Sequence, residues 1–274
     1  MKEENTLSII IPVHVFNDAV SDYLEKSIQS VVKQRDVEDK LPTIVMVYPK
    51  EIDNDIKNLV KKFEDQVNVE YVINEGDTDY QSQVNLAVDS LNSKYFAVLE
   101  FDDELSSTFV KNGYKYIETY DDIDIFLPMI IEVNTNNEGI KLTNESVWSQ
   151  QFVGDNGEMG YLNADCFKES TDFKLSGAII NKESFKSVGG YKKNIKLTFM
   201  YEFLLRAINN TCKIFTIPKI SYKHLNGREN SLFDEYQKNM PINERKFWFD
   251  VAAKEYNFIS DRVIDTSKLE NTEK

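Results

Sequence analysis

The chain has 274 residues, and its 46 acidic against 32 basic side chains leave a formal net charge of −14. A hydrophobic fraction of 41% supplies enough apolar material for a large core, so a disordered acidic protein is excluded. The negative charge argues against binding to DNA or RNA backbones, which needs clustered Lys and Arg. With no run near the ~20 apolar residues that cross a bilayer, and two cysteines, we expect a cytoplasmic protein without membrane segment or disulfide framework.

The first 130 residues alternate between apolar runs and helical periodicity. Helices are expected behind Asp18, a good cap residue, and over residues 52–63 and 84–91. Strands are expected between them, at residues 8–13, 43–48, 67–73 and 95–99. This alternation predicts an α/β fold, a mostly parallel open sheet with helices on both faces. Ligands of such sheets bind beyond the carboxyl ends of the strands.

The second half is less regular. Residues 134–172 are polar and weakly patterned, which suggests a long excursion that faces the active site or the acceptor. A helix is expected at 109–117, a strand at 123–131, a strand at 176–180, a helix at 199–208, a short strand at 213–217 and helix over 231–256. We therefore divide the chain into a domain at 1–230 and a C-terminal helical extension at 231–274, whose polar end (266–274) is expected to fray.

The most informative segment is residues 99–104, with the sequence LEFDDE. If the fourth strand continues through it, a period of two puts Glu100 and Asp102 on one face, and Asp103 begins the turn away from the sheet. Like charges packed together need a cation, and carboxylate oxygens suit Mg²⁺ or Mn²⁺. The alternative is a solvated acidic turn.

Four segments, taken in order, resemble family 2 glycosyltransferases with the Rossmann-like GT-A fold, of bacterial or phage type. They are SIIIPV at 8–13, the Asn74-x-Gly76…Asn85 stretch, LEFDD at 99–103, and Gly177 followed by VGGY at 188–191. The resemblance spans about residues 7–233. It implies that the acidic motif, here Glu100, Asp102 and Asp103, binds a divalent ion that bridges the diphosphate of a nucleotide sugar. Asp102 is the best single ligand by position.

The resemblance also indicates a donor pocket, with departures. The first strand is followed by His14, and the second ends in Tyr48 and Pro49 where similar enzymes have an acidic turn for the base. Tyr48 and His14 are candidates for contact with the base or, equally, ordinary packing residues. The expected donor-binding residues are Pro12, Val13, His14, Tyr48, Gln83, Asn85, Phe101 and Arg228. Asn85 has the alternative of bonding backbone.

Residues for the sugar or acceptor are fewer. Trp148 offers an aromatic face for a sugar, or is an exposed rim residue, and Ser176 with Gly177 permits close approach of substrate, or tight packing. His224 matches a His that lies near the metal in similar enzymes, and Arg228 suits phosphate oxygens.

The catalytic base is harder to place. Similar enzymes use the Asp of a Glu-Asp pair in a helix that ends in Leu-Arg, and here those two positions hold Phe199 and Met200. Glu202 is the acid of that helix and our candidate base, with the alternative of a structural pair with Arg206. Asp103, or an acid within 155–172, is next.

The resemblance implies a metal-dependent, inverting glycosyltransferase that moves a sugar from a nucleotide sugar, expected to be a UDP-sugar, to an acceptor hydroxyl. The alternatives are a nucleotidyl-transferring or other phosphate-handling enzyme and a non-catalytic nucleotide-sugar binder. A polysaccharide, a lipid-linked sugar, a protein or a modified DNA base remain open as acceptors.

Overall fold

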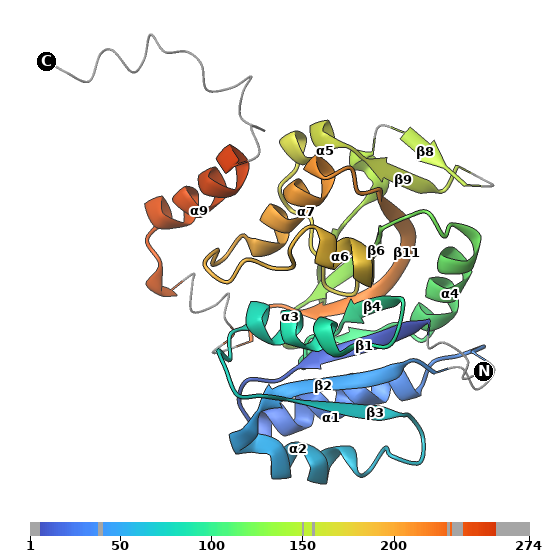
Figure 1. The fold of residues 1–274 in the computed structure, drawn as a ribbon, viewed down its shortest axis with the longest axis vertical. Helices are drawn as coiled ribbons and strands as arrows, with labels where there is room; N and C mark the ends of the chain where they lie inside the picture. Colours follow the sequence, from blue (N-terminus) through green and yellow to red (C-terminus); the bar gives the residue numbers. More distant parts are fainter. Residues whose placement is uncertain are drawn as a thin grey trace, which may run out of the picture.

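A single twisted sheet organises the protein (Figure 1). The computed structural model describes residues 6–37, 41–149, 151–154, 157–228, 231 and 238–255. The strand order is β3-β2-β1-β4-β10-β6-β11-β9-β8, with β5 paired to β11 and β7 to β6. The strands are β1 (Leu7–Pro12), β2 (Thr43–Pro49), β3 (Val69–Asn74), β4 (Tyr95–Val98), β5 (Glu104–Leu105), β6 (Ile125–Val133), β7 (Gly139–Thr143), β8 (Gln151–Val153), β9 (Met159–Leu162), β10 (Ile179–Asn181) and β11 (Ile214–Leu225).

The first four strands are parallel to one another, as the alternation of strands and helices predicted. β10 then enters antiparallel between β4 and β6, and β11 returns parallel to β6. The carboxyl ends of β1, β2, β3, β4, β6 and β11 therefore point the same way. Residues that follow these strands gather at one edge of the sheet.

Helices cover both faces. They are α1 (Asp18–Val32), α2 (Asp53–Val60), α3 (Tyr80–Ser90), α4 (Phe109–Thr119), α5 (Ala164–Glu169), α6 (Lys182–Ser187), α7 (Phe199–Asn209) and α9 (Ile242–Glu255), with short 3₁₀ turns η1 (Lys50–Ile52) and η2 (Ser146–Trp148). On β1, Ile9 and Ile11 pack with α1, α2 and α4, whereas Ile10 packs with α3, α5, α6 and α7. This alternation separates two hydrophobic cores and confirms the predicted two-layer cover.

Three local expectations are corrected. Asn17, one residue before Asp18, caps α1 by accepting a hydrogen bond from the Val20 N–H. The 134–172 excursion contains β7, β8, β9 and α5. β7 and β8 are largely exposed, so their sequences carry no alternation that would mark them as strands. The strand expected at 213–217 extends to Leu225, since pairing with β6 continues through two register shifts.

α9 lies against the body of the protein. The Thr198 hydroxyl donates to the Trp248 carbonyl at 3.1 Å, and Ala252 is fully buried. Phe247 and Phe249 of this helix are 55% and 37% exposed. The division at residue 230 stays a prediction, and the tail at 266–274 lies outside the described residues. Among the described helices, none combines the length and apolar character that crossing a bilayer demands.

Candidate active site

The acidic segment forms a turn rather than a continuation of the strand. β4 ends at Val98, and the Asp103 N–H donates to the Glu100 carbonyl at 3.0 Å, which closes a turn over residues 100–103. A turn of this kind brings its first and fourth residues together. Glu100 therefore lies beside Asp103, and the predicted shared face of Glu100 and Asp102 is wrong.

Asp103 is buried at the centre of the cluster. Its carboxylate accepts hydrogen bonds from the Tyr222 hydroxyl at 2.7 Å, from His224 Nδ1 at 2.9 Å and from the Leu225 N–H at 2.8 Å. Because the side chain is enclosed, Asp103 as reserve base stays a prediction that these contacts do not favour. Two of the hydrogen bonds end on Oδ2 and one on Oδ1, which leaves one acceptor site on Oδ1 for a metal. Asp103 fixes the β11 residues around it.

Burial makes this cluster electrostatically unusual. Burial first, and the neighbouring Asp103 charge second, raise the pKa of Glu100 to about 7. Burial alone would lower the pKa of His224, but the Asp103 carboxylate outweighs it and raises that pKa to about 9. Ser176 donates to Glu100 Oε1 at 2.7 Å. Removing these acids from water without a full set of cations is costly, which is the physical signature of a cation site.

The donor set fits a divalent ion. One ligand atom from each of Glu100, Asp103 and His224 lies within 4.8 Å of the others, the one such group among the residues that the structure describes. Because Asp103 takes His224 Nδ1, the Nε2 atom is the ring nitrogen left for a metal, a pairing common in metal sites. Two carboxylates and an imidazole suit Mn²⁺ or Mg²⁺.

Asp102 is directed elsewhere. Arg228 Nε donates to its Oδ2 at 2.6 Å, and the guanidinium also lies over the Phe101 ring, 5.1 Å from its centroid. Burial, followed by the Asp103 charge, raises the pKa of Asp102, and Arg228 offsets part of that rise. The group whose ligand atoms lie within reach of one ion is Glu100, Asp103 and His224, and Asp102 as the leading metal ligand stays a prediction.

Glu202 is fully buried in α7. Its two oxygens accept from Arg206 Nε and Nη2, each at 2.9 Å, and Lys192 Nζ lies 3.4 Å from Oε1. A carboxylate held by this fork cannot reach an acceptor hydroxyl without breaking a buried ion pair. The geometry corrects the prediction of Glu202 as base and matches the structural alternative with Arg206.

Two residues of α3 that were predicted to bind the sugar donor, Asn85 and Gln83, form hydrogen bonds with the protein backbone. Asn85 Oδ1 accepts from the Tyr191 N–H at 2.9 Å, and its Nδ2 donates to the Tyr191 carbonyl at 2.8 Å. Gly190 has φ +62° and lies so close that an added Cβ would be 2.7 Å from the Asn85 oxygen. Gln83 is buried and donates to the Thr78 carbonyl. The motif at 188–191 thus joins α3 to the end of α6.

At the ends of β1 and β2 the predicted residues divide into two groups. Tyr48 is fully buried and donates its hydroxyl to Asp53 at 2.8 Å, so it is a packing residue and not a stacking face. Pro12 and Val13 are buried in pairing with β2. His14 is exposed and lies 5.8 Å from Phe101, ring centroid to centroid. His14 and the Phe101–Arg228 pair remain as candidates for the donor.

The predicted sugar or acceptor residues are only partly in place. Ser176 contacts Glu100, but Gly177 makes its close approach to Tyr222: an added Cβ would be 2.3 Å from that ring, at φ +67°. Trp148 is 44% exposed in η2, on the β9 side of the sheet. Within the described residues, no contact joins it to the carboxylates.

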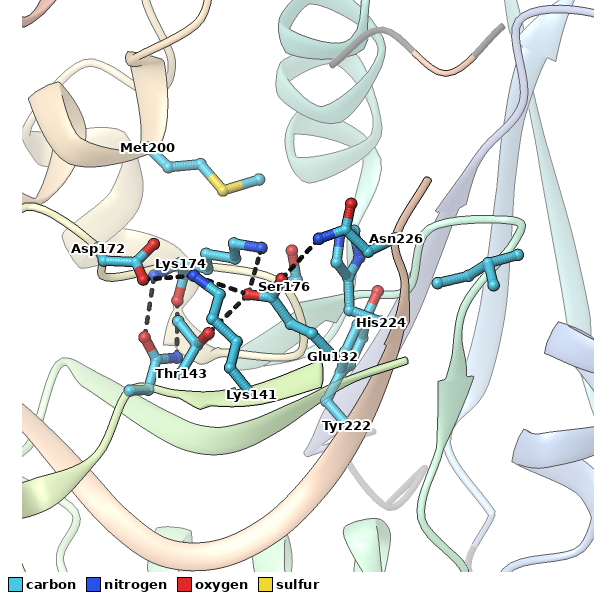
Figure 2. Close-up of polar contacts among 12 residues, drawn as sticks. Glu132, Lys141, Thr143, Asp172, Lys174, Ser176, Met200, Tyr222, His224 and Asn226 are labelled. Atoms are coloured by element: carbon cyan, nitrogen blue, oxygen red, sulfur yellow. Dashed lines mark hydrogen bonds and ion pairs between the residues drawn. The ribbon is translucent and has the colours of Figure 1, made fainter. Parts of the chain in front are cut away.

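A second charged network adjoins the cluster, and the sequence analysis missed it (Figure 2). Glu132 is buried and accepts from Thr143 at 2.6 Å, Lys174 at 2.8 Å and Asn226 at 2.9 Å, with Lys141 3.5 Å away. Glu132 pairs with His224 across β6 and β11. A signal existed, because Glu132 directly follows a predicted buried strand, as Glu100 does.

The family model described as glycosyl transferase family 2 matches residues 8–188, more than half of the chain. The chain belongs to glycosyl transferase family 2. It is therefore a glycosyltransferase with the GT-A fold, as the resemblance implied. Comparison of the sequence with curated proteins gives no match.

Crystal structures of TarS from S. aureus are similar in fold. TarS 1–349 aligns at a TM-score of 0.63 and 14% identity over 92% of this chain and 80% of that one. The same fragment in complex with UDP-GlcNAc aligns at 0.64 and 15% identity, over 97% and 76%. The longer TarS structure aligns at 0.59 and 17% identity, over 98% of this chain but 46% of that one.

Proposed function

We propose that this glycosyltransferase moves a sugar from a nucleoside-diphosphate sugar, with UDP as the nucleotide, to an acceptor oxygen, in a metal-dependent reaction that inverts the anomeric carbon. The observation that carries the proposal is the group of Glu100, Asp103 and His224 at the carboxyl edge of the sheet in a family 2 chain. The TarS structures in complex with UDP-GlcNAc and UDP support the choice of donor. Membership in the family favours this reaction over nucleotidyl transfer or binding alone.

Glu100, Asp103 and His224 would hold Mn²⁺ or Mg²⁺. When bound, the ion offsets the charge that develops on the leaving diphosphate. Asp103 orients His224 and Tyr222, and Ser176 orients Glu100. These contacts set the ligand atoms before substrate arrives.

Arg228 and His14 would act at the nucleotide side. Arg228 is held by Asp102 over the Phe101 ring, and the His14 ring also contacts the Phe101 ring. Guanidinium groups suit the oxygens of a diphosphate, which they can bind through two parallel N–H donors. The position of His14 at the end of β1 suits contact with the base or ribose.

The test is turnover of a nucleotide-sugar panel with Mn²⁺, with Mg²⁺ and with chelator. We expect hydrolysis or transfer that chelator abolishes, and a first-formed sugar product whose anomeric configuration is opposite to that of the donor by NMR. Glu100→Gln should remove metal-stimulated turnover. Glu104→Gln, a change of the neighbouring acid that pairs with Lys223, is the matched control and should keep it.

Two results would overturn the proposal. One is the absence of any nucleotide-sugar binding or turnover by the unmodified chain. The other is metal-stimulated turnover in Glu100→Gln that equals that of the unmodified chain, which would remove the cluster from the reaction.

A further inference from the structure

Lys174 is a lysine fixed at both ends. Asn144, in a left-handed conformation at φ +61°, accepts from the Lys174 N–H at 2.9 Å and donates to the Lys174 carbonyl at 2.9 Å and to that of Pro128 at 3.0 Å. Glu132 holds the other end, since Lys174 Nζ donates to its Oε1 at 2.8 Å. A flexible side chain has thereby lost most of its conformational freedom in advance.

Glu132 does not depend on Lys174 alone. Thr143, Asn226 and Lys141 also donate to its carboxylate or lie beside it. Burial alone would raise the pKa of Glu132, but hydrogen bonds from Lys174 and Thr143 outweigh it and lower that pKa to about 2. Glu132 is thus a permanent anion that accepts several hydrogen bonds and fixes the position of the Lys174 ammonium.

The ammonium keeps donors for a ligand. Lys174 has three N–H groups, and within the described part of the chain its side chain bonds only to Glu132. Its side chain is 25% exposed, against 1% for Glu132. Two N–H donors and one positive charge are therefore accessible from solvent.

The position of Lys174 in the fold indicates which part of the substrate its ammonium would contact. Two residues after Lys174, Ser176 contacts Glu100, and Glu132 is the strand partner of His224. Figure 2 shows Lys174, Ser176, His224 and Asn226 in one group below Met200. In the sheet, β6 and β11 lie on one side of β4 and the nucleotide-side strands β1 and β2 on the other, so Lys174 faces the sugar and acceptor end.

The neighbouring α7 residue is neutral. The Met200 sulfur accepts from the Leu175 N–H, next to Lys174 in the chain, at 3.4 Å. Met200 therefore brings no charge to this segment.

We propose that Lys174 binds an oxyanion, a phosphate or a carboxylate, that belongs to the acceptor or to the transferred sugar. Glu132 and Asn144 are the positioning residues of this subsite. The inference rests on the proposed function, because it takes the carboxylate cluster as the place of transfer.

The experiment uses the full chain, and UDP with Mg²⁺ is titrated first by calorimetry. Inorganic phosphate is then titrated into the protein saturated with UDP and Mg²⁺, so that the diphosphate position is already filled. We expect phosphate to bind the unmodified chain, Lys174→Gln to weaken it at least tenfold, and UDP affinity to stay within twofold in that variant. Lys141→Gln is the matched control, because Lys141 is a second lysine beside Glu132 with a 42% exposed side chain, and it should keep phosphate affinity.

A second arm distinguishes the two sources of the anion. Phosphate is titrated into protein saturated with UDP-glucose or with UDP-glucuronic acid. Phosphate binding that persists in both assigns the subsite to the acceptor. Phosphate binding that is lost only with UDP-glucuronic acid assigns it to a carboxylate on the sugar.

Other outcomes overturn the inference. They are no phosphate binding by the unmodified chain, equal affinity in the unmodified chain and Lys174→Gln, or equal loss in Lys174→Gln and Lys141→Gln, which would mean that the lysines only neutralise Glu132. Failure of the proposed function is separate, because it would be seen in the first titration as the absence of UDP binding. Loss of folding in Lys174→Gln would be detected by circular dichroism, and Lys174→Arg, which keeps the charge, then serves as the second variant and should retain phosphate affinity.

Discussion

The buried pair of Glu202 and Arg206 offers the sharpest test of which carboxylates act in catalysis. Glu202→Gln removes the charge but keeps the size of the side chain, and it leaves the buried, charged Arg206 without the carboxylate that faces it. Loss of one partner of a buried ion pair costs about 3–5 kcal/mol of unfolding free energy. For a chain of this size each kcal/mol shifts Tm by roughly 2–4 °C, so we expect a fall of roughly 6–20 °C.

The assay combines chemical denaturation with nucleotide-sugar turnover at a temperature where both proteins are folded. Turnover of Glu202→Gln should remain within about twofold of the unmodified chain, since both Glu202 oxygens are held by Arg206 inside α7. The double variant Glu202→Leu with Arg206→Met is the control, because replacing both charges restores most of the stability. Unchanged stability together with abolished turnover in Glu202→Gln would refute the structural role and reinstate Glu202 as the base.

Three further predictions concern the same region. Asn85→Ala should lose about 1–3 kcal/mol of unfolding free energy, because two backbone groups of Tyr191 lose their partner, while UDP affinity by calorimetry stays within twofold; a tenfold loss would return Asn85 to the donor site. Gly177→Ala should destabilise the chain by about 1–3 kcal/mol and weaken Mn²⁺ binding, because the new methyl group collides with the Tyr222 ring; unaltered Mn²⁺ affinity would separate Tyr222 from the metal site. Thermal stability without metal should fall as the pH rises from about 5 to about 9, since Glu100 with pKa about 7 and His224 with pKa about 9 bind more protons folded than unfolded. Glu100→Gln should flatten the acidic half of that curve, and an unchanged slope would count against the raised pKa.

Much of the fold was predictable because its first half obeys simple periodicities. β1 and β2 are buried on both faces and therefore read as continuous apolar runs, and α1 buries one stripe. In the second half, the prediction failed where the strands are only partly buried. β8 is exposed along its whole length, so its sequence carries no alternation that would mark it as a strand.

The candidate site was predictable at the level of the segment but not of the atom. The rule that ligands bind at the carboxyl ends of strands found residues 99–104, yet the face of each acid depended on where β4 ends. A strand one or two residues longer would have paired Glu100 with Asp102, whereas the observed turn pairs it with Asp103. Single residues such as Tyr48 were misassigned because nothing in the sequence shows that Asp53, five residues later, takes the hydroxyl.

Two basic residues near the cluster, Arg228 and Lys174, are each held by an acid outside the proposed metal ligands. Asp102 holds Arg228 over the Phe101 ring, and Glu132 holds Lys174. Each cation is fixed by a carboxylate that is separate from Glu100 and Asp103, so neither neutralises the acids that would hold a metal. In the proposed function, the diphosphate of the substrate would meet Arg228 and the metal ligands, and a second anion of the substrate would meet Lys174. Replacing Arg228 should therefore weaken the binding of UDP, and replacing Lys174 should weaken only the binding of the second anion. If either residue had only a structural role, its replacement would not separate the two affinities in this way.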